Sequence, residues 1–274
     1  MKQVVVAATR PAFGLEVWRR RLLIAAVLGY AGFLIVAPLA ALVNGALSEG
    51  LGSIIAALSR PGVLRSFWLT LWICLVVVVV HSLFGTLTAW VLVRDSFPGR
   101  RLLNALIDMP FAVSPVVVGY MLLLLFGRNG LLGGSGLKVA FAWPGLVLAT
   151  LFVTLPFMVR ELTPMLRALG TQQEQAAATL GASGWQTFRL VTFPALRWGF
   201  IYGVILTFAR ALGEFGAVLV IGGGIQGRTD TATVFIYHAL EERDYVGAYS
   251  AALVLGLFSL LLVLGTDLLR RHKD

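Results

Sequence analysis

Two charged residues interrupt an apolar stretch of this 274-residue sequence and could act on a charged solute. Arg210 and Glu214 lie within the run 198–221, four residues apart, so a helix places both on one face. Charged groups inside such a run are costly in lipid, and they face a cavity or a partner. Two interpretations stay open. The residues line an anion pathway in which Arg210 supplies positive potential, or they form an internal ion pair that holds one helix against another.

Catalytic chemistry is not indicated by the motifs of this sequence. No stretch of the form G-x-x-x-x-G-K-S/T, H-E-x-x-H or G-x-S-x-G occurs. The single cysteine, Cys74, excludes a disulfide framework and a cysteine-based metal cluster. The histidines His81 and His238 have no second ligand at metal spacing. We predict no catalytic site, no metal site and no cofactor in this chain, which disfavours a membrane enzyme. The energy for any transport must then come from a partner or an ion gradient.

The composition indicates a membrane protein built from helices. Hydrophobic residues make up 58% and charged residues 13%, against about 45–50% and about 25% in typical soluble domains. Six apolar runs are each near or above the ~20 residues that cross a bilayer as a helix, and a spanning segment without water must satisfy its own backbone groups. We therefore expect an all-α membrane protein. Its six transmembrane helices are expected at about 22–43, 67–93, 102–126, 139–159, 198–221 and 246–266.

The distribution of basic residues predicts the orientation of these spans. Of the 22 lysines and arginines, 15 fall in the segments 1–21, 94–101, 160–197 and 269–274, 6 fall in the segments 44–66, 127–138 and 223–245, and Arg210 lies within an apolar run. Basic residues concentrate on the cytoplasmic side of membrane proteins. We expect a cytoplasmic N-terminal segment 1–21, a cytoplasmic tail 269–274 and a long cytoplasmic loop 160–197. The net charge of +9 is then an orientation signal and requires no nucleic acid.

The long loop has the pattern of two short helices joined by a glycine turn. Thr171 and Glu174 fit a capping box at the start of the first helix. Gly181 offers the left-handed position at which helices commonly end. Ser183 and Gln186 fit a second capping box. Long structured loops tend to be functional, so a solvated connector and a docking element are both open from the residues alone.

The same loop resembles the EAA motif of ABC importer permeases, which reads Glu-Ala-Ala, three residues, Gly, nine residues and Ile-x-Leu-Pro. The matching positions are Gln175-Ala176-Ala177, Gly181, Val191, Phe193 and Pro194, with all spacings kept. The substantive departure is Gln175, because it removes a charge expected to pair with a basic residue of the ATPase. Glu174 is an alternative acid one position earlier, but it points about 100° away around the helix.

The resemblance extends over roughly residues 60–268, to the W-type permease of sulphate/thiosulphate importers. The similar segments are 107–115 (IDMPFAVSP), 126–130 (FGRNG), 153–157 (VTLPF), 213–217 (GEFGA) and 227–231 (GRTDT). The GEFGA segment is shared with molybdate permeases, so it does not fix the anion. The resemblance implies a type I ABC importer permease fold, with a transmembrane permease domain over 22–268 and a cytoplasmic coupling helix in the loop 160–197.

The resemblance also implies a set of partners. These are a second, T-type permease, two cytoplasmic ATPase subunits that hold ATP and Mg, and an extracytoplasmic sulphate/thiosulphate-binding protein, assembled on a bacterial inner membrane. The residues it assigns to ATPase coupling are Glu174, Gln175, Ala176, Ala177 and Gly181.

Two rival functions stay open. The first is an importer of the same architecture for molybdate or tungstate, which are also tetrahedral dianions. The second is a gradient-driven secondary transporter, which commonly contains inverted repeats. No internal repeat is evident in this sequence.

Overall fold

The computed structural model describes the backbone of residues 13–271 and the side chains of residues 17–265. Parts of the expected N-terminal segment 1–21 and tail 269–274 therefore lie outside the described residues. Within the described part every regular element is helical, which confirms the all-α expectation. The elements are α1 (Phe13–Leu47), α2 (Leu51–Leu58), α3 (Pro61–Val80), the π-helical turn η1 (His81–Gly85), α4 (Thr86–Arg94), α5 (Arg100–Ala112), α6 (Pro115–Phe126), the 3₁₀ turn η2 (Gly133–Ser135), α7 (Trp143–Leu169), α8 (Gln172–Thr179), α9 (Gly184–Thr187), the π-helical turn η3 (Phe188–Thr192), α10 (Phe193–Leu212), α11 (Gly216–Gly222), α12 (Ala232–Glu241) and α13 (Tyr245–Arg271).

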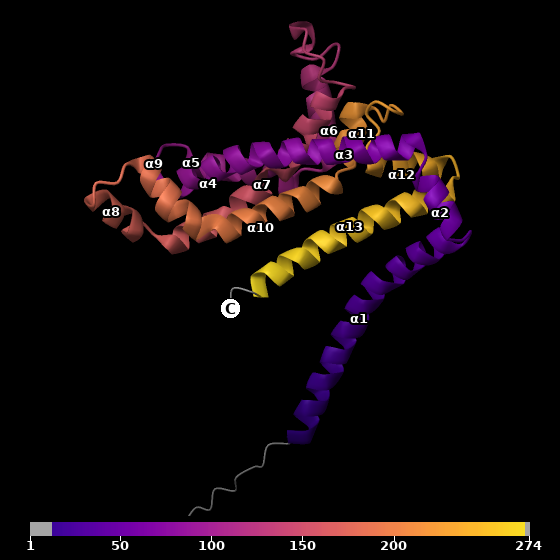
Figure 1. The fold of residues 1–274 in the computed structure, drawn as a ribbon, viewed down its shortest axis with the longest axis horizontal. Helices are drawn as coiled ribbons and strands as arrows, with labels where there is room; N and C mark the ends of the chain where they lie inside the picture. Colours follow the sequence, from indigo (N-terminus) through magenta and orange to yellow (C-terminus); the bar gives the residue numbers. More distant parts are fainter. Residues whose placement is uncertain (1–12, 272–274) are drawn as a thin grey trace, which may run out of the picture.

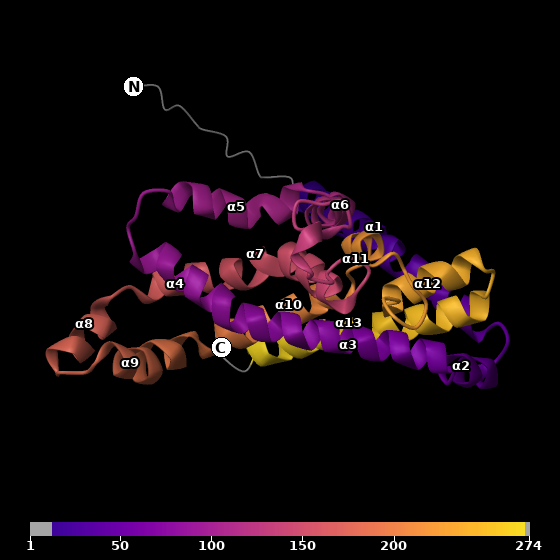
Figure 2. The same cartoon turned by 90° about the horizontal axis from the view of Figure 1, so that it is seen from above.

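Five helices of the described part are long and apolar enough to cross a membrane, and a bent pair would make a sixth. The spans α3–η1–α4, α7, α9–η3–α10 and α13 run lengthwise through the molecule (Figure 1). At one end α8 and α9 project beyond the bundle; we call this the loop end. At the other end lie α2 and α12, and Figure 2 shows the same arrangement from above.

The third expected span is a bent pair of helices. The helix direction changes by 114° between α5 and α6. The bend follows from Pro115, since a residue before proline is pushed out of the helical region, and Ser114 adopts extended backbone angles (φ −59°, ψ 136°). In Figure 1, α6 stands out from the lengthwise helices for this reason.

The fifth expected span, 198–221, is also placed differently. Its helix begins at Gly184, continues through η3 and α10, and ends at Leu212. The chain then breaks before α11, so Arg210 lies in the last turn of α10 and not near the middle of a span.

Helix α7 forms the centre of the bundle, because it contacts α3, α4, α5, α6, α10 and α11. Its side chains Leu146, Leu162 and Leu166 are fully buried. Gly203 of α10 lies against α7, and a Cβ atom there would stand 2.6 Å from the sulphur of Met158. Small residues at such positions let membrane helices approach closely.

The first helix is peripheral. Helix α1 contacts only α2 and α13 appreciably, and none of its most apolar window is buried within the chain. Figure 1 shows it slanting away from the other spans.

The close contact between α6 and α11 generates a stability prediction. A Cβ atom on Gly119 of α6 would stand 2.6 Å from the Cβ of Val220 and 2.9 Å from the carbonyl oxygen of Ala217. Gly119→Ala should therefore force the helices apart and lower the free energy of unfolding by about 1–3 kcal/mol, as overpacking does. Thermal unfolding in detergent measures this, with Gly62→Ala as the control because a Cβ atom there meets nothing within 4 Å. Equal midpoints for the two variants would contradict the packing described for α6 and α11.

Candidate functional site

A hollow of about 540 Å³ opens where α5 meets α6. Residues around the bend form one side of its wall, and α7 and α10 complete it. The lining residues are Pro110, Phe111, Ala112, Val113, Ser114, Pro115, Val153, Phe157 and Arg210. Arg210 is the one charged residue of the lining, so the hollow suits a negatively charged or polar solute.

The two residues marked first in the sequence do form an ion pair. Nη2 of Arg210 lies 2.9 Å from Oε2 of Glu214. Glu214 is buried, and its Oε1 accepts a hydrogen bond of 3.1 Å from the backbone N–H of Ala217 in the first turn of α11. Its carboxylate thus joins the end of α10 to the start of α11. The Arg210 side chain remains 29% exposed and lines the hollow. Glu214 has the geometry of a structural lock, and Arg210 is open to a solute.

A second charged pair lies close by on α5 and α7. Arg160 Nε donates to Asp108 Oδ1 at 2.6 Å, its Nη2 donates to the other carboxylate oxygen, and the same Nη2 donates to the backbone oxygen of Asn104 at 3.3 Å. The side chains of Arg160 and Asp108 are 31% and 43% exposed. Val153, Phe157 and Arg160 have the helical spacing of one face of α7. Because partly exposed charges are costly against lipid, we expect protein or water to cover this face.

Arg160 was assigned by sequence to the start of the loop 160–197. The structure instead places it within α7, which continues to Leu169. The sequence contains one signal for this pair. Asp108 lies in an apolar run and therefore requires a basic partner, but the sequence does not show which residue that partner is.

The loop end has the expected helix–turn–helix form. Gly181 follows α8 with φ of +84°, the left-handed conformation expected there. The second capping box is confirmed: Ser183 Oγ accepts from the Gln186 N–H at 3.3 Å, and Gln186 Oε1 accepts from the Ser183 N–H at 2.7 Å. The prediction of the first capping box is wrong, because Thr171 makes no side-chain capping bond to α8.

The reason for that failure is the direction of Glu174. Its carboxylate turns toward the bundle and pairs with Nη2 of Arg94 at 2.9 Å, leaving the side chain 16% exposed. Glu174 therefore does not present its charge outward as a substitute for the acid missing at Gln175. In the sequence, Arg94 served only as one of the basic residues that predict the orientation of the spans. Its pairing with Glu174 could not be predicted, because the two residues are 80 positions apart.

The outward surface of the loop end combines small and large apolar residues. Gln175 and Ala176 are exposed, and Ala177 is half-buried. Leu180 is 89% exposed and Trp185 is 68% exposed. Apolar groups gathered on an exposed surface commonly mark a contact with another protein.

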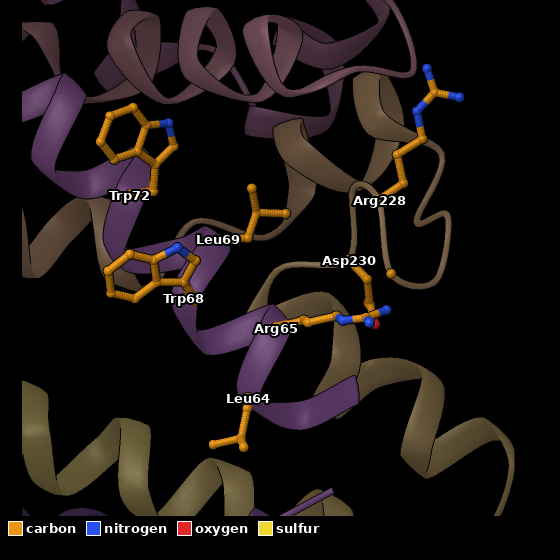
Figure 3. Close-up of a pocket in the computed structure, with 8 residues that line it drawn as sticks. Leu64, Arg65, Trp68, Leu69, Trp72, Arg228 and Asp230 are labelled. Atoms are coloured by element: carbon orange, nitrogen blue, oxygen red, sulfur yellow. The ribbon is translucent and has the colours of Figure 1, made fainter. Parts of the chain in front are cut away.

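An open cleft of about 670 Å³ lies toward the opposite end of the molecule (Figure 3). Figure 3 shows Trp68 and Trp72 of α3 directed to one side and Arg228 reaching away from its loop. Asp230 is buried at this cleft, where Ser66 Oγ donates to it at 3.3 Å. Burial raises the pKa of the Asp230 carboxyl above its usual value, and nearby His238 partly opposes that shift.

Comparison with known proteins assigns the chain to a family. Residues 81–274 match the family described as the binding-protein-dependent transport system inner membrane component. The chain belongs to that family. The match includes the hollow, the charged pairs and the whole loop end of this inner membrane component.

Proteins similar to this inner membrane component include sulphate permeases. It is 46% identical to the sulfate transport system permease protein CysW of Escherichia coli strain K12 over 250 residues, which cover 89% of this chain and 85% of the relative. It is 47% identical to CysW of Synechococcus elongatus, covering 85% and 82% of the two chains. It is also 39% identical to the E. coli permease CysT, covering 85% and 86%.

Solved structures of ABC transporters share the fold. A chain of a bacterial alginate ABC transporter, in complex with a periplasmic protein that holds an alginate pentasaccharide, superposes with a TM-score of 0.77 at 17% identity, covering 94% of this chain and 96% of the other. A chain of the MetNI methionine ABC transporter gives a TM-score of 0.57 at 15% identity, covering 77% and 95%. The expected ABC importer permease fold is thereby confirmed.

The lock at Glu214 generates a second stability prediction. Glu214→Ala removes the ion pair to Arg210 and leaves the Ala217 N–H without its acceptor. We expect it to lower the free energy of unfolding by about 1–3 kcal/mol, the usual cost of a lost charged hydrogen bond or an unsatisfied buried donor. Glu214→Gln keeps one acceptor oxygen and should fall between wild type and Glu214→Ala in a thermal melt. A Glu214→Ala melt that coincides with wild type would refute the lock.

Proposed function

We propose that this chain is the W-type permease subunit of an ATP-driven ABC importer that moves sulphate and thiosulphate into the cytoplasm. The observation that carries the proposal is the 46% identity with a sulphate permease along 89% of the chain. The chain itself is the non-catalytic subunit, and separate ATPase subunits with ATP and Mg supply the energy.

The partners and the orientation belong to the same proposal. A second, T-type permease pairs with this chain across the face that carries Arg210 and the Arg160–Asp108 pair, and so closes the hollow into a pathway. Two ATPase subunits dock at the loop end. An extracytoplasmic anion-binding protein docks at the opposite end. Both termini then face the cytoplasm of a bacterial cell whose inner membrane holds the chain, in keeping with the basic residues of the expected cytoplasmic segments.

The exposed surface of the loop end supports its role in coupling. The small side chain of Ala176 allows a close approach, and Leu180 and Trp185 offer apolar area for a groove on the ATPase. Gln175 is exposed at the position where the resembling motif has glutamate. The contact at Gln175 is therefore a neutral hydrogen bond or a packing contact, and shape carries more of the docking than charge.

Arg210 is the group of this chain proposed to meet the anion. Its guanidinium lines the hollow, and Glu214 holds it in place through one of its nitrogen atoms. Arginine suits a tetrahedral oxyanion because its planar fork donates several hydrogen bonds at once. Selection between sulphate and molybdate is assigned to the binding protein, because these dianions are alike in charge and shape.

The first experiment is purification of the chain with a C-terminal tag from its native host in mild detergent. Stoichiometric recovery of a P-loop ATPase and a second permease supports the proposal. Uptake of labelled sulphate against labelled molybdate, in vesicles loaded with ATP and supplied with the binding protein, then identifies the anion. Recovery of the chain alone, stable and able to move an anion without ATP, would overturn the proposal in favour of a secondary transporter.

Arg210→Ala should reduce anion uptake roughly tenfold or more, because a hydrogen bond to a charged group contributes about 1.5–3 kcal/mol. Assembly of the complex should survive, since the buried Glu214 keeps its bond to α11. Uptake by vesicles and gel filtration of the same preparation measure the two effects. Arg210→Lys is the control, because it keeps the charge and loses the planar fork. Loss of the assembled complex with Arg210→Ala would show that the residue acts structurally.

Gly181→Val should stall ATP-linked uptake without unfolding the spans. A β-branched residue resists positive φ, whereas Gly181 has φ of +84° and open space around it, so the effect is one of backbone conformation and not of a clash. Gly184→Val is the matched control in the same loop, since Gly184 has no positive φ and is equally open. Comparable uptake by the two variants would remove the argument for a fixed turn.

A further inference from the structure

A single arginine joins three elements at the loop end. Arg94 is the last residue of α4. Its Nη2 donates to the backbone oxygen of Gly170 at 2.6 Å and to Glu174 Oε1 at 2.9 Å. Gly170 ends α7, and Glu174 lies in the first turn of α8. The Arg94 side chain is 11% exposed, so this guanidinium is shielded from water.

The carboxylate of Glu174 extends the connection to a fourth element. The same Oε1 atom also accepts a hydrogen bond of 3.0 Å from the hydroxyl of Thr192. Thr192 is fully buried and is the residue directly before α10. One oxygen atom of α8 is therefore bonded to the end of the span α3–η1–α4 and to the last residue of η3, within the span α9–η3–α10.

Aromatic contacts hold the neighbouring helix to the same span. Trp90, one turn before Arg94, meets the ring of Phe188 edge-on with 5.6 Å between centroids. Phe188 stacks on Trp185 of α9 at 5.7 Å. The guanidinium of Arg94 lies 5.7 Å from the Trp90 ring centroid. The last turn of α4 thus contacts α8 through charge and α9–η3 through aromatic packing.

Beyond this attachment, helix α8 contacts only η3 and α9 appreciably. None of its residues is buried, and Gly170 and Gly181 at its two ends both have positive φ. An exposed helix between two glycine turns would swing freely if it lacked a side-chain attachment to the bundle. A force applied to its outer surface would then bend the turns and would not move the spans.

We propose that the Arg94–Glu174 pair is the link that carries movement of α8 into the spans, so that Arg94 is a positioning residue for the coupling step. This inference rests on the proposed function, because it takes α8 as the element that the ATPase moves. It also gives the acid at position 174 a role separate from ATPase contact. Glu174 is paired with Arg94 on the inner side of α8, while Gln175 is exposed on the outer surface.

The test is the number of anions transported per ATP hydrolysed by the full complex in proteoliposomes. The assay uses the binding protein and labelled sulphate. We expect Arg94→Gln and Glu174→Gln to lower this ratio about fivefold or more, which is the lower range of an energetic coupling between sites. ATP hydrolysis itself should persist. The double variant should be no worse than either single variant, because each single change already breaks the link. Arg101→Gln is the control, an exposed arginine at the same end of the bundle.

Two results would overturn the link. The first is an unchanged ratio in the single variants, which includes the case in which uptake and hydrolysis fall in proportion. The second is single-variant effects that add in the double variant. If removal of one buried charge prevents assembly, the double variant decides the question. It removes both charges together and leaves no buried charge unpaired, so the link requires a lower ratio in this variant and an unchanged ratio refutes it. Wild-type complex that fails to couple ATP to uptake would refute the proposed function itself.

Discussion

A hydrocarbon layer provides no water to a charged side chain, so every charge in or beside a span must be paired or covered. Among the described residues, four arginine–carboxylate pairs help to meet this demand: Arg210–Glu214, Arg160–Asp108, Arg94–Glu174 and Arg60–Asp244. The pairs differ in exposure. Arg94 is closed off among four elements, whereas Arg210 and Arg160 remain partly open on the face around the hollow. Arginine–carboxylate pairs thus hold the loop end together and also leave partly exposed charged groups along one wall of the bundle.

Much of this architecture follows from local sequence. Runs of apolar residues near the length of a bilayer crossing dictate helices, because only helices satisfy the backbone without water. The turn at Gly181 and the capping box at Ser183 depend on residues within a few positions of each other, and both are found where the sequence indicates them. The ion pair joins Arg210 in the last turn of α10 to Glu214 just after it, and a separation of four residues makes the pair predictable for the same reason, although the helix ends between them.

Features that depend on distant residues could not be derived in this way. Glu174 has a local capping partner in Thr171, yet a guanidinium 80 residues earlier in the chain competes successfully for its carboxylate. A carboxylate paired with a guanidinium in a shielded place is held more strongly than one that accepts a capping bond from a backbone N–H at an exposed helix start. Sequence spacing does not reveal which groups are shielded. The bend at Ser114 is a different case: Pro115 was visible, but the length of the apolar run favoured one straight helix.

The peripheral position of α1 has a consequence for how the protein is made. Its backbone bonds are internal, none of its most apolar window is buried by the chain, and its contacts are with α2 and the final helix α13. A helix of this kind loses no packing by entering the bilayer alone. During synthesis α1 can therefore enter the membrane before α13 has been made. The contact between α1 and α13 forms only after this last span has left the ribosome.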